Sequence, residues 1–207
     1  MTRSDVFVAG LRRFAPVSAG QPILDEPRMN RQALAELRRG LGTFHDHTAL
    51  YRYVIPFMPE QSLGSDTLET YLLIAALFAL HPAPFVTPSW ENLGGTWWRL
   101  LPHEATPEDQ NTRDRLEKRF IALLRTSRTL LPQHLRTMTL FLKQANIPIN
   151  WSVLLDDLLV WDLPKKKQRV LEAWARSFWR VSTSNNSVLP EMTPDDNTVV
   201  DEETHAE

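Results

Sequence analysis

Apolar residues recur along this chain at the three- and four-residue spacing that is typical of helices with one buried face. Leu34, Leu37 and Leu41 show this spacing early in the sequence, and the pattern returns in residues 116–124 and 135–142. The Asn-Gly and Asp-Gly pairs that mark tight β-hairpins do not occur in the sequence. The pattern predicts an all-α protein, a bundle of roughly eight helices with proline-rich connections.

Prolines and helix-capping residues predict where these helices begin. Thr106-Pro107-Glu108-Asp109 is the strongest such signal, because a capping residue is followed by a proline at the first helical position and by acids in the first turn. Further helices are expected to start at Asn30, at Ser65-Asp66, at Pro132, at Asn150 or Ser152, and at Pro164, with the last one reaching about Val181.

Two apolar segments need a separate interpretation. The run over residues 72–80 is about half as long as a membrane span, so we expect a buried core helix and no membrane contact. Residues 82–106 contain Gly94-Gly95 and Trp97-Trp98 and predict an irregular connection. We expect its tryptophans to cover the core, while a ring pair for base stacking or partner docking is an open alternative.

The net charge of −2 conceals an uneven distribution along the chain. Residues 1–180 contain all 23 Lys and Arg against 18 Asp and Glu, whereas residues 181–207 contain the remaining 7 acids and no Lys or Arg. We expect one helical domain over residues 1–181, with an N-terminal half (1–105) and a C-terminal half (106–181). An acidic, disordered tail is expected over residues 182–207.

The last predicted helix places its positive charge on one side. At about 100° per residue, Lys165, Arg169, Arg176 and Arg180 fall within an arc of roughly 60°. The apolar residues of this helix, from Val170 to Phe178, lie on the opposite side. The four cations therefore form a stripe about 22 Å long.

Two other predicted helices repeat this arrangement less strictly. In the helix after Thr106 the cations share one face, with Arg119 at its edge, and in the helix after Asn30 two arginines are seven residues apart. These further candidate cations are Arg115, Lys118, Arg119 and Arg125, then Arg31, Arg38 and Arg39, and also Arg136.

Such cationic faces can follow a nucleic-acid backbone, because cations spaced along a groove displace counterions without reading bases. An equally simple interpretation is that they are the solvated outer faces of ordinary amphipathic helices. The acidic tail is expected to keep the protein soluble, or else to screen the basic faces when nucleic acid is absent.

The sequence offers little catalytic chemistry. It contains no cysteine, which excludes disulfides, thiolate metal sites and cysteine nucleophiles, and it contains no glycine-rich phosphate loop. His45-Asp46-His47 is the one histidine cluster, and a metal-dependent enzyme centred there is the weakest of our hypotheses. Adjacent Asp156 and Asp157 diverge by about 100° on a helix and do not form a catalytic pair. We expect no enzyme activity, no metal and no cofactor.

Several segments, in a consistent order, resemble the CasB family, the small subunit of the type I-E CRISPR surveillance complex, Cascade. In the N-terminal half they are Ala33–Gly42, Leu63-Gly64 and Leu73–Pro82. In the C-terminal half they are Glu117–Leu124, Leu131–Arg136, Ile149–Leu158, Trp161-Asp162 and Val170–Trp179. The resemblance extends over about residues 5–181, is poor over residues 82–106, and does not include the acidic tail.

We expect a cytoplasmic protein, because the sequence shows no apolar stretch typical of an export signal or a membrane span. The resemblance implies an all-helical, non-catalytic subunit that sits as a pair in the complex. There it contacts the guide CRISPR RNA, the target DNA and the displaced strand, and stabilises the R-loop beside the subunits CasA, CasC, CasD and CasE. The cations within the matching segments are Arg38, Arg39, Arg119, Arg136 and Arg176.

Two alternatives remain open. These arginines could pair with Asp156, Asp157 or Asp162 inside the fold, Arg119 above all. The chain could also be an architectural spacer that contacts only protein neighbours through exposed apolar patches at Trp97-Trp98 or Trp179.

Overall fold

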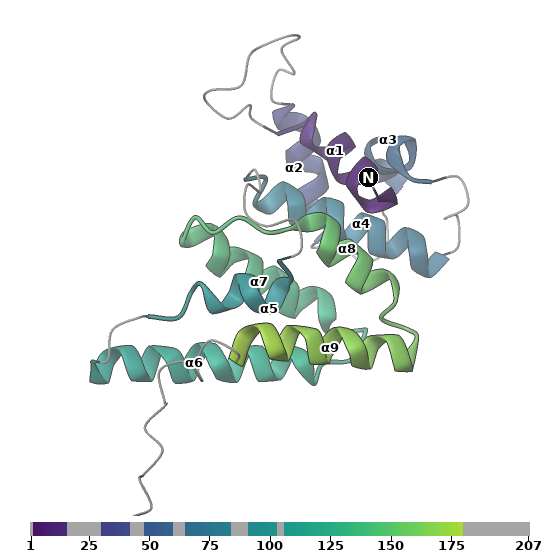
Figure 1. Cartoon of the computed structure of the whole chain (residues 1–207). Helices are drawn as coiled ribbons and strands as arrows, with labels where there is room; N and C mark the ends of the chain where they lie inside the picture. Colours follow the sequence, from purple (N-terminus) through teal and green to yellow (C-terminus); the bar gives the residue numbers. More distant parts are fainter. Residues whose placement is uncertain are drawn as a thin grey trace, which may run out of the picture.

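The computed structural model describes residues 2–15, 30–41, 48–59, 65–83, 91–102 and 106–179, and these residues fold into helices without any strand. They form nine α-helices and one short 3₁₀ helix, so the all-α prediction is confirmed with one helix more than the expected eight (Figure 1). The elements are α1 (Arg3–Arg12), α2 (Arg31–Arg39), α3 (Thr48–Val54), η1 (Ile55–Phe57), α4 (Ser65–Leu80), α5 (Leu93–Trp98), α6 (Pro107–Leu124), α7 (Leu131–Gln144), α8 (Trp151–Leu159) and α9 (Pro164–Trp179).

The predicted helix starts agree closely with the structure. The side chains of Asn30, Thr106 and Asn150 each accept a hydrogen bond from the backbone N–H three residues later, at 2.9, 3.1 and 3.2 Å. These bonds satisfy amide groups that the helix itself leaves without partners. Asn150, rather than Ser152, is therefore the cap of α8.

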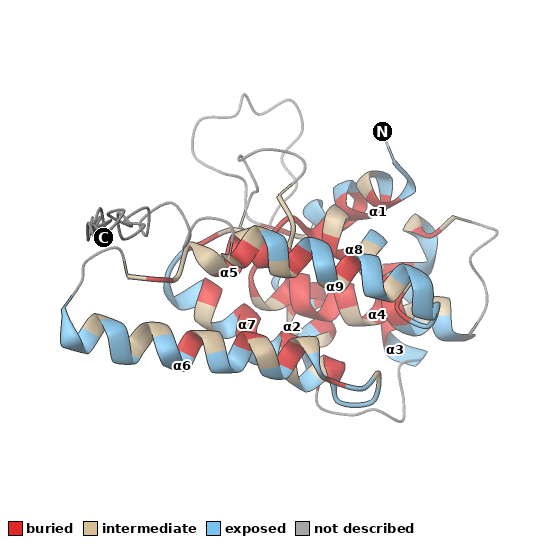
Figure 2. Cartoon of the chain, turned by 60° about the horizontal axis from the view of Figure 1, so that its bottom comes forward, coloured by how far each residue is buried: buried red, intermediate tan, exposed pale blue. Residues whose placement is uncertain are grey.

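Helix α4 forms the centre of the molecule, as the apolar run over residues 72–80 predicts. It packs against α2, α7 and α8, and its side chains from Ile74 to Ala79 are buried. Figure 2 shows this helix as the buried middle of the bundle. Within the described residues, no helix combines the length and the apolar character that crossing a bilayer requires.

One hydrophobic cluster joins the predicted halves. Helix α8 of the C-terminal half packs against α1 and α4, and α5, before residue 106, packs against α9. The cluster accordingly contains Phe7 and Leu37 together with Trp151 and Trp174. The expected tail over residues 182–207 lies outside the described residues.

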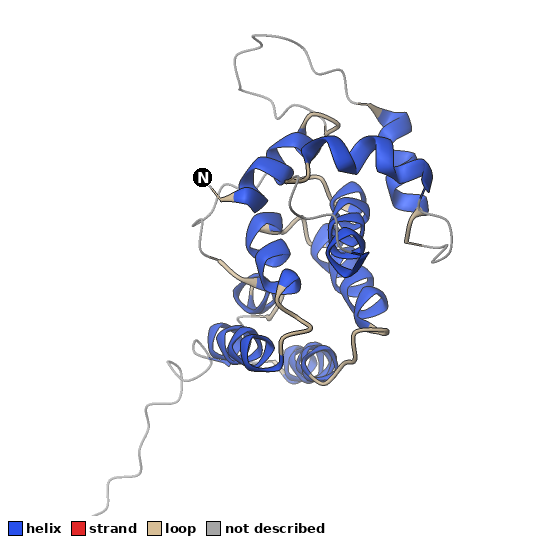
Figure 3. Ribbon diagram, turned by 90° about the vertical axis from the view of Figure 1, so that its right-hand side faces the viewer, coloured by secondary structure: helices blue, strands red, loops and turns tan. Residues whose placement is uncertain are grey.

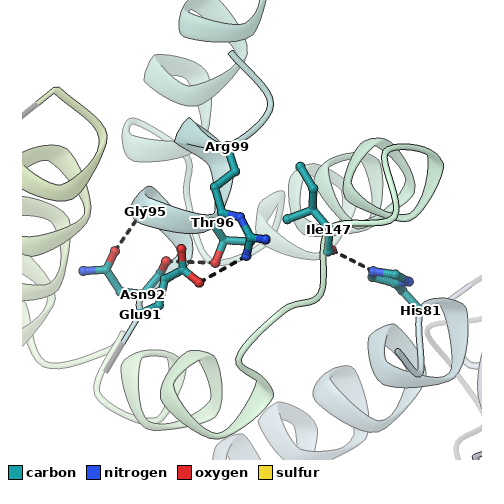
Figure 4. A network of polar contacts seen from close by, with 7 residues as sticks. All are labelled: His81, Glu91, Asn92, Gly95, Thr96, Arg99 and Ile147. Atoms are coloured by element: carbon teal, nitrogen blue, oxygen red, sulfur yellow. Dashed lines mark hydrogen bonds and ion pairs between the residues drawn. The ribbon is translucent and has the colours of Figure 1, made fainter. Parts of the chain in front are cut away.

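Within residues 82–106, the segment Leu93–Trp98 forms helix α5, which the sequence analysis does not predict. Asn92 caps α5 by accepting from the Gly95 N–H at 3.1 Å (Figure 4). The Asn92 amide also donates to Ser177 of α9 at 3.0 Å. Gly94 approaches α9 so closely that a Cβ there would lie 2.0 Å from the Trp174 carbonyl oxygen. The prediction of an irregular connection is therefore wrong for residues 93–98, because a tertiary contact, not local propensity, holds this helix.

The tryptophan pair of this segment covers the core, as expected. Trp97 is completely buried, and its indole N–H donates to the Leu116 carbonyl of α6 at 3.1 Å. Trp98 is partly buried against the same core. The alternative of an exposed pair for base stacking is wrong for Trp97.

Candidate nucleic-acid interface

Helix α9 presents its cations to solvent. Lys165, Arg169 and Arg176 are exposed, whereas Val170, Trp174 and Phe178 on the opposite side are buried. Arg180, the fourth member of the predicted stripe, lies outside the described residues. The three described cations span about 16 Å along the helix axis. We call these three side chains the α9 stripe.

Helix α6 also keeps its cations exposed, but on a more crowded face. Arg115, Lys118, Arg119 and Arg125 are all exposed. The Arg115 guanidinium donates to the Asn111 carbonyl at 3.3 Å and to the Thr112 hydroxyl at 3.2 Å. The Arg119 guanidinium lies over the Phe141 ring of α7, 4.9 Å from its centroid. This cation–π contact holds Arg119 at the flank of α6 that faces α7.

A groove of about 390 Å³ runs between α6 and α7. Lys118, Arg119 and Ala122 line it from α6, and α7 contributes the side chains of Gln133, His134, Thr137 and Met138, with Trp97 beneath. None of the residues that line it carries a carboxylate. The groove therefore combines two permanent cations with an amide, a hydroxyl and an imidazole, all able to donate hydrogen bonds to an anion.

The α7 residues of this groove were missed in the sequence analysis. His134, Gln133 and Thr137 belong to no cationic pattern in the sequence. Only the packing of α7 beside α6 brings them into one groove with Lys118. Arg136, the predicted α7 cation, is exposed. It lies on the other side of α7, about 160° around the helix from His134.

The cationic faces of α6 and α9 do not merge into one surface. The two helices lie side by side along the bottom of the molecule, and Figure 2 shows exposed residues along both (Figures 1 to 3). At their contact the Trp179 indole donates to Glu117 at 2.9 Å, and Phe120 stacks on Phe178 with centroids 4.4 Å apart. By helix geometry, Glu117 and the exposed Glu172 lie in the strip between the two stripes.

Helix α2 carries its cations at the opposite end of the molecule from α6 and α9 (Figures 1 and 3). Arg31, Arg38 and Arg39 are exposed there. The Arg38 Nε donates to the Ala79 carbonyl at 2.6 Å, which ties α2 to the end of α4. The structure thus brings Lys118 and Arg119 together in one groove, lines up three cations on α9, and keeps α2 apart from both.

In a comparison with protein families, the family described as CRISPR-associated protein Cse2 matches residues 33–179. The chain belongs to the Cse2 family. The Cse2 match begins within α2 and ends with the last residue of α9, so it includes all the candidate cations except Arg31 and Arg180. No curated protein matches the chain.

Several solved structures share this fold. The crystal structure of CasB from Thermus thermophilus is 27% identical, with a TM-score of 0.63, over 87% of this chain and 99% of that one. M. ruber CasB is 25% identical, with a TM-score of 0.62, over 89% and 96% of the two chains. A chain of a CRISPR RNA-guided surveillance complex, 21% identical with a TM-score of 0.63 over 88% and 97%, shares the fold.

Three aspartates were considered as internal partners for the arginines of the family-matching segments, and all three contact other residues. Asp156 accepts a hydrogen bond from the Ser4 hydroxyl, and Asp157 accepts one from the Trp174 indole at 2.6 Å. Asp162 lies 3.8 Å from Arg128, which is not a candidate cation. Elsewhere in the described part of the chain, ion pairs join Arg52 to Glu36 and Arg99 to Glu91. These contacts leave the α9 stripe available to a partner.

The predicted histidine cluster, His45-Asp46-His47, lies outside the described residues. Where the chain is described, no three His, Asp or Glu side chains come together as metal ligands would. His81 has a structural role there, since its ring bonds to the Ile147 carbonyl at 2.8 Å (Figure 4). Burial lowers the pKa of His81, against the opposing effect of that hydrogen bond.

Proposed function

We propose that this chain is the non-catalytic small subunit of a type I-E CRISPR surveillance complex and that it stabilises the R-loop by contacting nucleic-acid backbone. Its partners in this proposal are the guide CRISPR RNA, the target DNA with its displaced strand, the subunits CasA, CasC, CasD and CasE, and a second copy of the chain.

The α9 stripe is the observation that carries the proposal. Lys165, Arg169 and Arg176 are exposed on one side of a helix whose other side is anchored by the buried Trp174 and Phe178. Cations on a rigid helix can meet successive phosphates without ordering a loop, so little conformational entropy is lost on binding. The family match and the likeness to a chain of a surveillance complex support the same assignment.

Backbone contact suffices for this function because sequence is read elsewhere. In RNA-guided systems the guide pairs with the target strand, and the exchange of duplex for heteroduplex is nearly balanced in free energy. A few phosphate contacts to the opened strands can therefore tip the equilibrium toward the R-loop. No bond is made or broken in this step, so the chain needs no catalytic group.

An architectural spacer is less well supported. Its proposed contacts were Trp97-Trp98 and Trp179, but Trp97 is buried and Trp179 packs on Phe120 with its indole bonded to Glu117. The exposed large apolar residues of the described chain are Val6 on α1, Ile55 on η1, Leu130 and Leu140 at the cap and in the body of α7, and Leu163 before α9.

Photo-crosslinking in the assembled complex tests the proposal. A photoreactive residue at Ala173, exposed beside the α9 stripe, should give adducts with nucleic acid when target DNA is bound. The same residue at Ala9, exposed on α1, is the matched control and should give none. A spacer would give only protein adducts from Ala173, and that result would contradict the proposal.

A further inference from the structure

The groove between α6 and α7 is chemically unlike the α9 stripe. Lys118 and Arg119 enter it from one helix, and Gln133, His134 and Thr137 face them from the other. Donors that converge from two helices can surround an extended anionic segment, whereas the α9 stripe is a convex row on a single helix. The groove can therefore hold several carboxylates at once.

The last described residue before the acidic end of the chain lies against α6, one of the two helices that form the groove. Trp179, the last described residue of α9, is bonded to Glu117, which directly precedes Lys118 on α6. The groove lies on the far side of α6, about 10–12 Å away across a helix with its side chains. Glu191, the first acid after α9, follows Trp179 by 12 residues, which span at most about 40 Å. The acids are therefore within reach.

The charges on the two sides are complementary. Residues 181–207 carry 7 acids and no Lys or Arg, and the lining of the groove carries two permanent cations and no acid. Because both belong to one chain, their contact does not pay the entropic cost of bringing two molecules together.

We propose that the groove between α6 and α7 binds the acidic segment 191–207 of the same chain, and that this segment competes there with nucleic acid. The competition rests on the proposed function, whereas the contact itself does not. Docked carboxylates would mask Lys118 and Arg119 in the isolated subunit, and a phosphate backbone would displace them on assembly.

A spin label in the tail tests the contact on the full chain without nucleic acid. The chain has no cysteine, so Thr193→Cys creates one labelling site. A nitroxide at this position should weaken the amide NMR signals of residues 118–122 of α6 and 133–138 of α7 more than the amide signals of the other helices. The effect should disappear in Lys118→Gln/Arg119→Gln and when all seven acids are changed to Asn or Gln.

The matched control is Lys165→Gln/Arg169→Gln, which removes the same charge from α9. It should leave the signal loss at the groove unchanged. A signal loss centred on α9, or one that persists after the seven acids are neutralised, would overturn the proposed contact.

A binding measurement then tests the competition. At low salt, the variant with the neutral tail should bind a single-stranded oligonucleotide about threefold to tenfold more tightly than the unchanged chain. The gain should be absent in the Lys118→Gln/Arg119→Gln background. Equal affinities with and without the acids, or no binding by either form, would overturn the competition. The NMR result decides the contact separately, and crosslinking in the assembled complex decides the proposed function.

Discussion

The Trp174 indole N–H donates a 2.6 Å hydrogen bond to the Asp157 carboxylate, joining α9 to α8 beneath the α9 stripe. Trp174 is completely buried, and its ring also packs on Trp161, 5.6 Å between centroids. The pKa of Asp157 is raised to about 6. Burial of the carboxyl is the main cause and the nearby charge of Asp156 adds to it, and together they outweigh the Trp174 hydrogen bond, which lowers the pKa.

This pKa predicts how stability depends on pH. The pKa of Asp157 in the fold lies above its ordinary value of 3.8, so the folded state favours the protonated form and holds the charged form at a cost. That cost is absent below pH 3.8, grows as the pH rises toward 6, and is complete above it. The difference between 3.8 and about 6 corresponds to about 3 kcal/mol at most.

Asp157→Asn should therefore stabilise the protein at neutral pH, because the amide oxygen still accepts from Trp174 and carries no charge. Urea unfolding at pH 4 and pH 7.5 measures the effect. The free energy of unfolding of the variant, relative to that of the unchanged protein, should be higher at pH 7.5 than at pH 4 by about 1–3 kcal/mol. A gain that is the same at both pH values, or a loss at pH 7.5, would contradict this account of the carboxyl.

Gly94 and Gly95 form a matched pair for testing how α5 is held. A Cβ at Gly94 would lie 2.0 Å from the Trp174 carbonyl oxygen, so Gly94→Ala must push α5 away from α9 and should cost about 1–3 kcal/mol. At Gly95 the nearest atom to a Cβ would be Cγ of Glu91, a flexible side chain, at 3.3 Å. Gly95→Ala should leave the melting temperature unchanged or raise it slightly. Equal destabilisation by both substitutions would show that α5 is not clamped as described.

Arg128 offers a contrast between a hydrogen bond and a surface ion pair. Its guanidinium donates to the buried Thr70 hydroxyl at 2.6 Å and to the Leu158 carbonyl at 3.4 Å, which ties α4 to α8. Its ion pair with Asp162 is longer, 3.8 Å, and the Asp162 side chain is 53% exposed. Arg128→Met should therefore cost about 1–3 kcal/mol and Asp162→Asn less than about 0.5 kcal/mol in thermal unfolding. The reverse order would contradict this assignment.

Local sequence signals predict most of this fold. The caps at Asn30, Thr106 and Asn150 and the apolar spacing of α4 act within one helix, so they can be recognised without knowing the neighbours. Helix α5 could not be recognised, because Gly94 and Gly95 disfavour a helix and only contact with α9 makes the glycines useful. Helix α1, with 10 residues, and helix α3, with 7, were not predicted individually either.

The candidate interface is only partly predictable for a related reason. Helical periodicity places Lys165, Arg169 and Arg176 on one face, and the structure keeps that face exposed. Which helices stand side by side is set by long-range packing. The sequence therefore could not show that Lys118 and Arg119 meet His134 in a groove, or that α2 lies at the other end of the molecule.

The salt dependence of target-DNA binding by the assembled complex tests the central claim most directly. The variant Lys165→Gln/Arg169→Gln/Arg176→Gln is compared with Arg3→Gln/Arg12→Gln/Lys143→Gln, which removes the same charge from exposed positions away from α9. If the α9 stripe contacts phosphates, the first variant should bind more weakly and the slope of log affinity against log salt should become shallower by about 0.7–0.9 per lost contact. The control should keep the original slope. An unchanged slope in the α9 variant, or the same change in both variants, would contradict the claim that these side chains bind the nucleic-acid backbone.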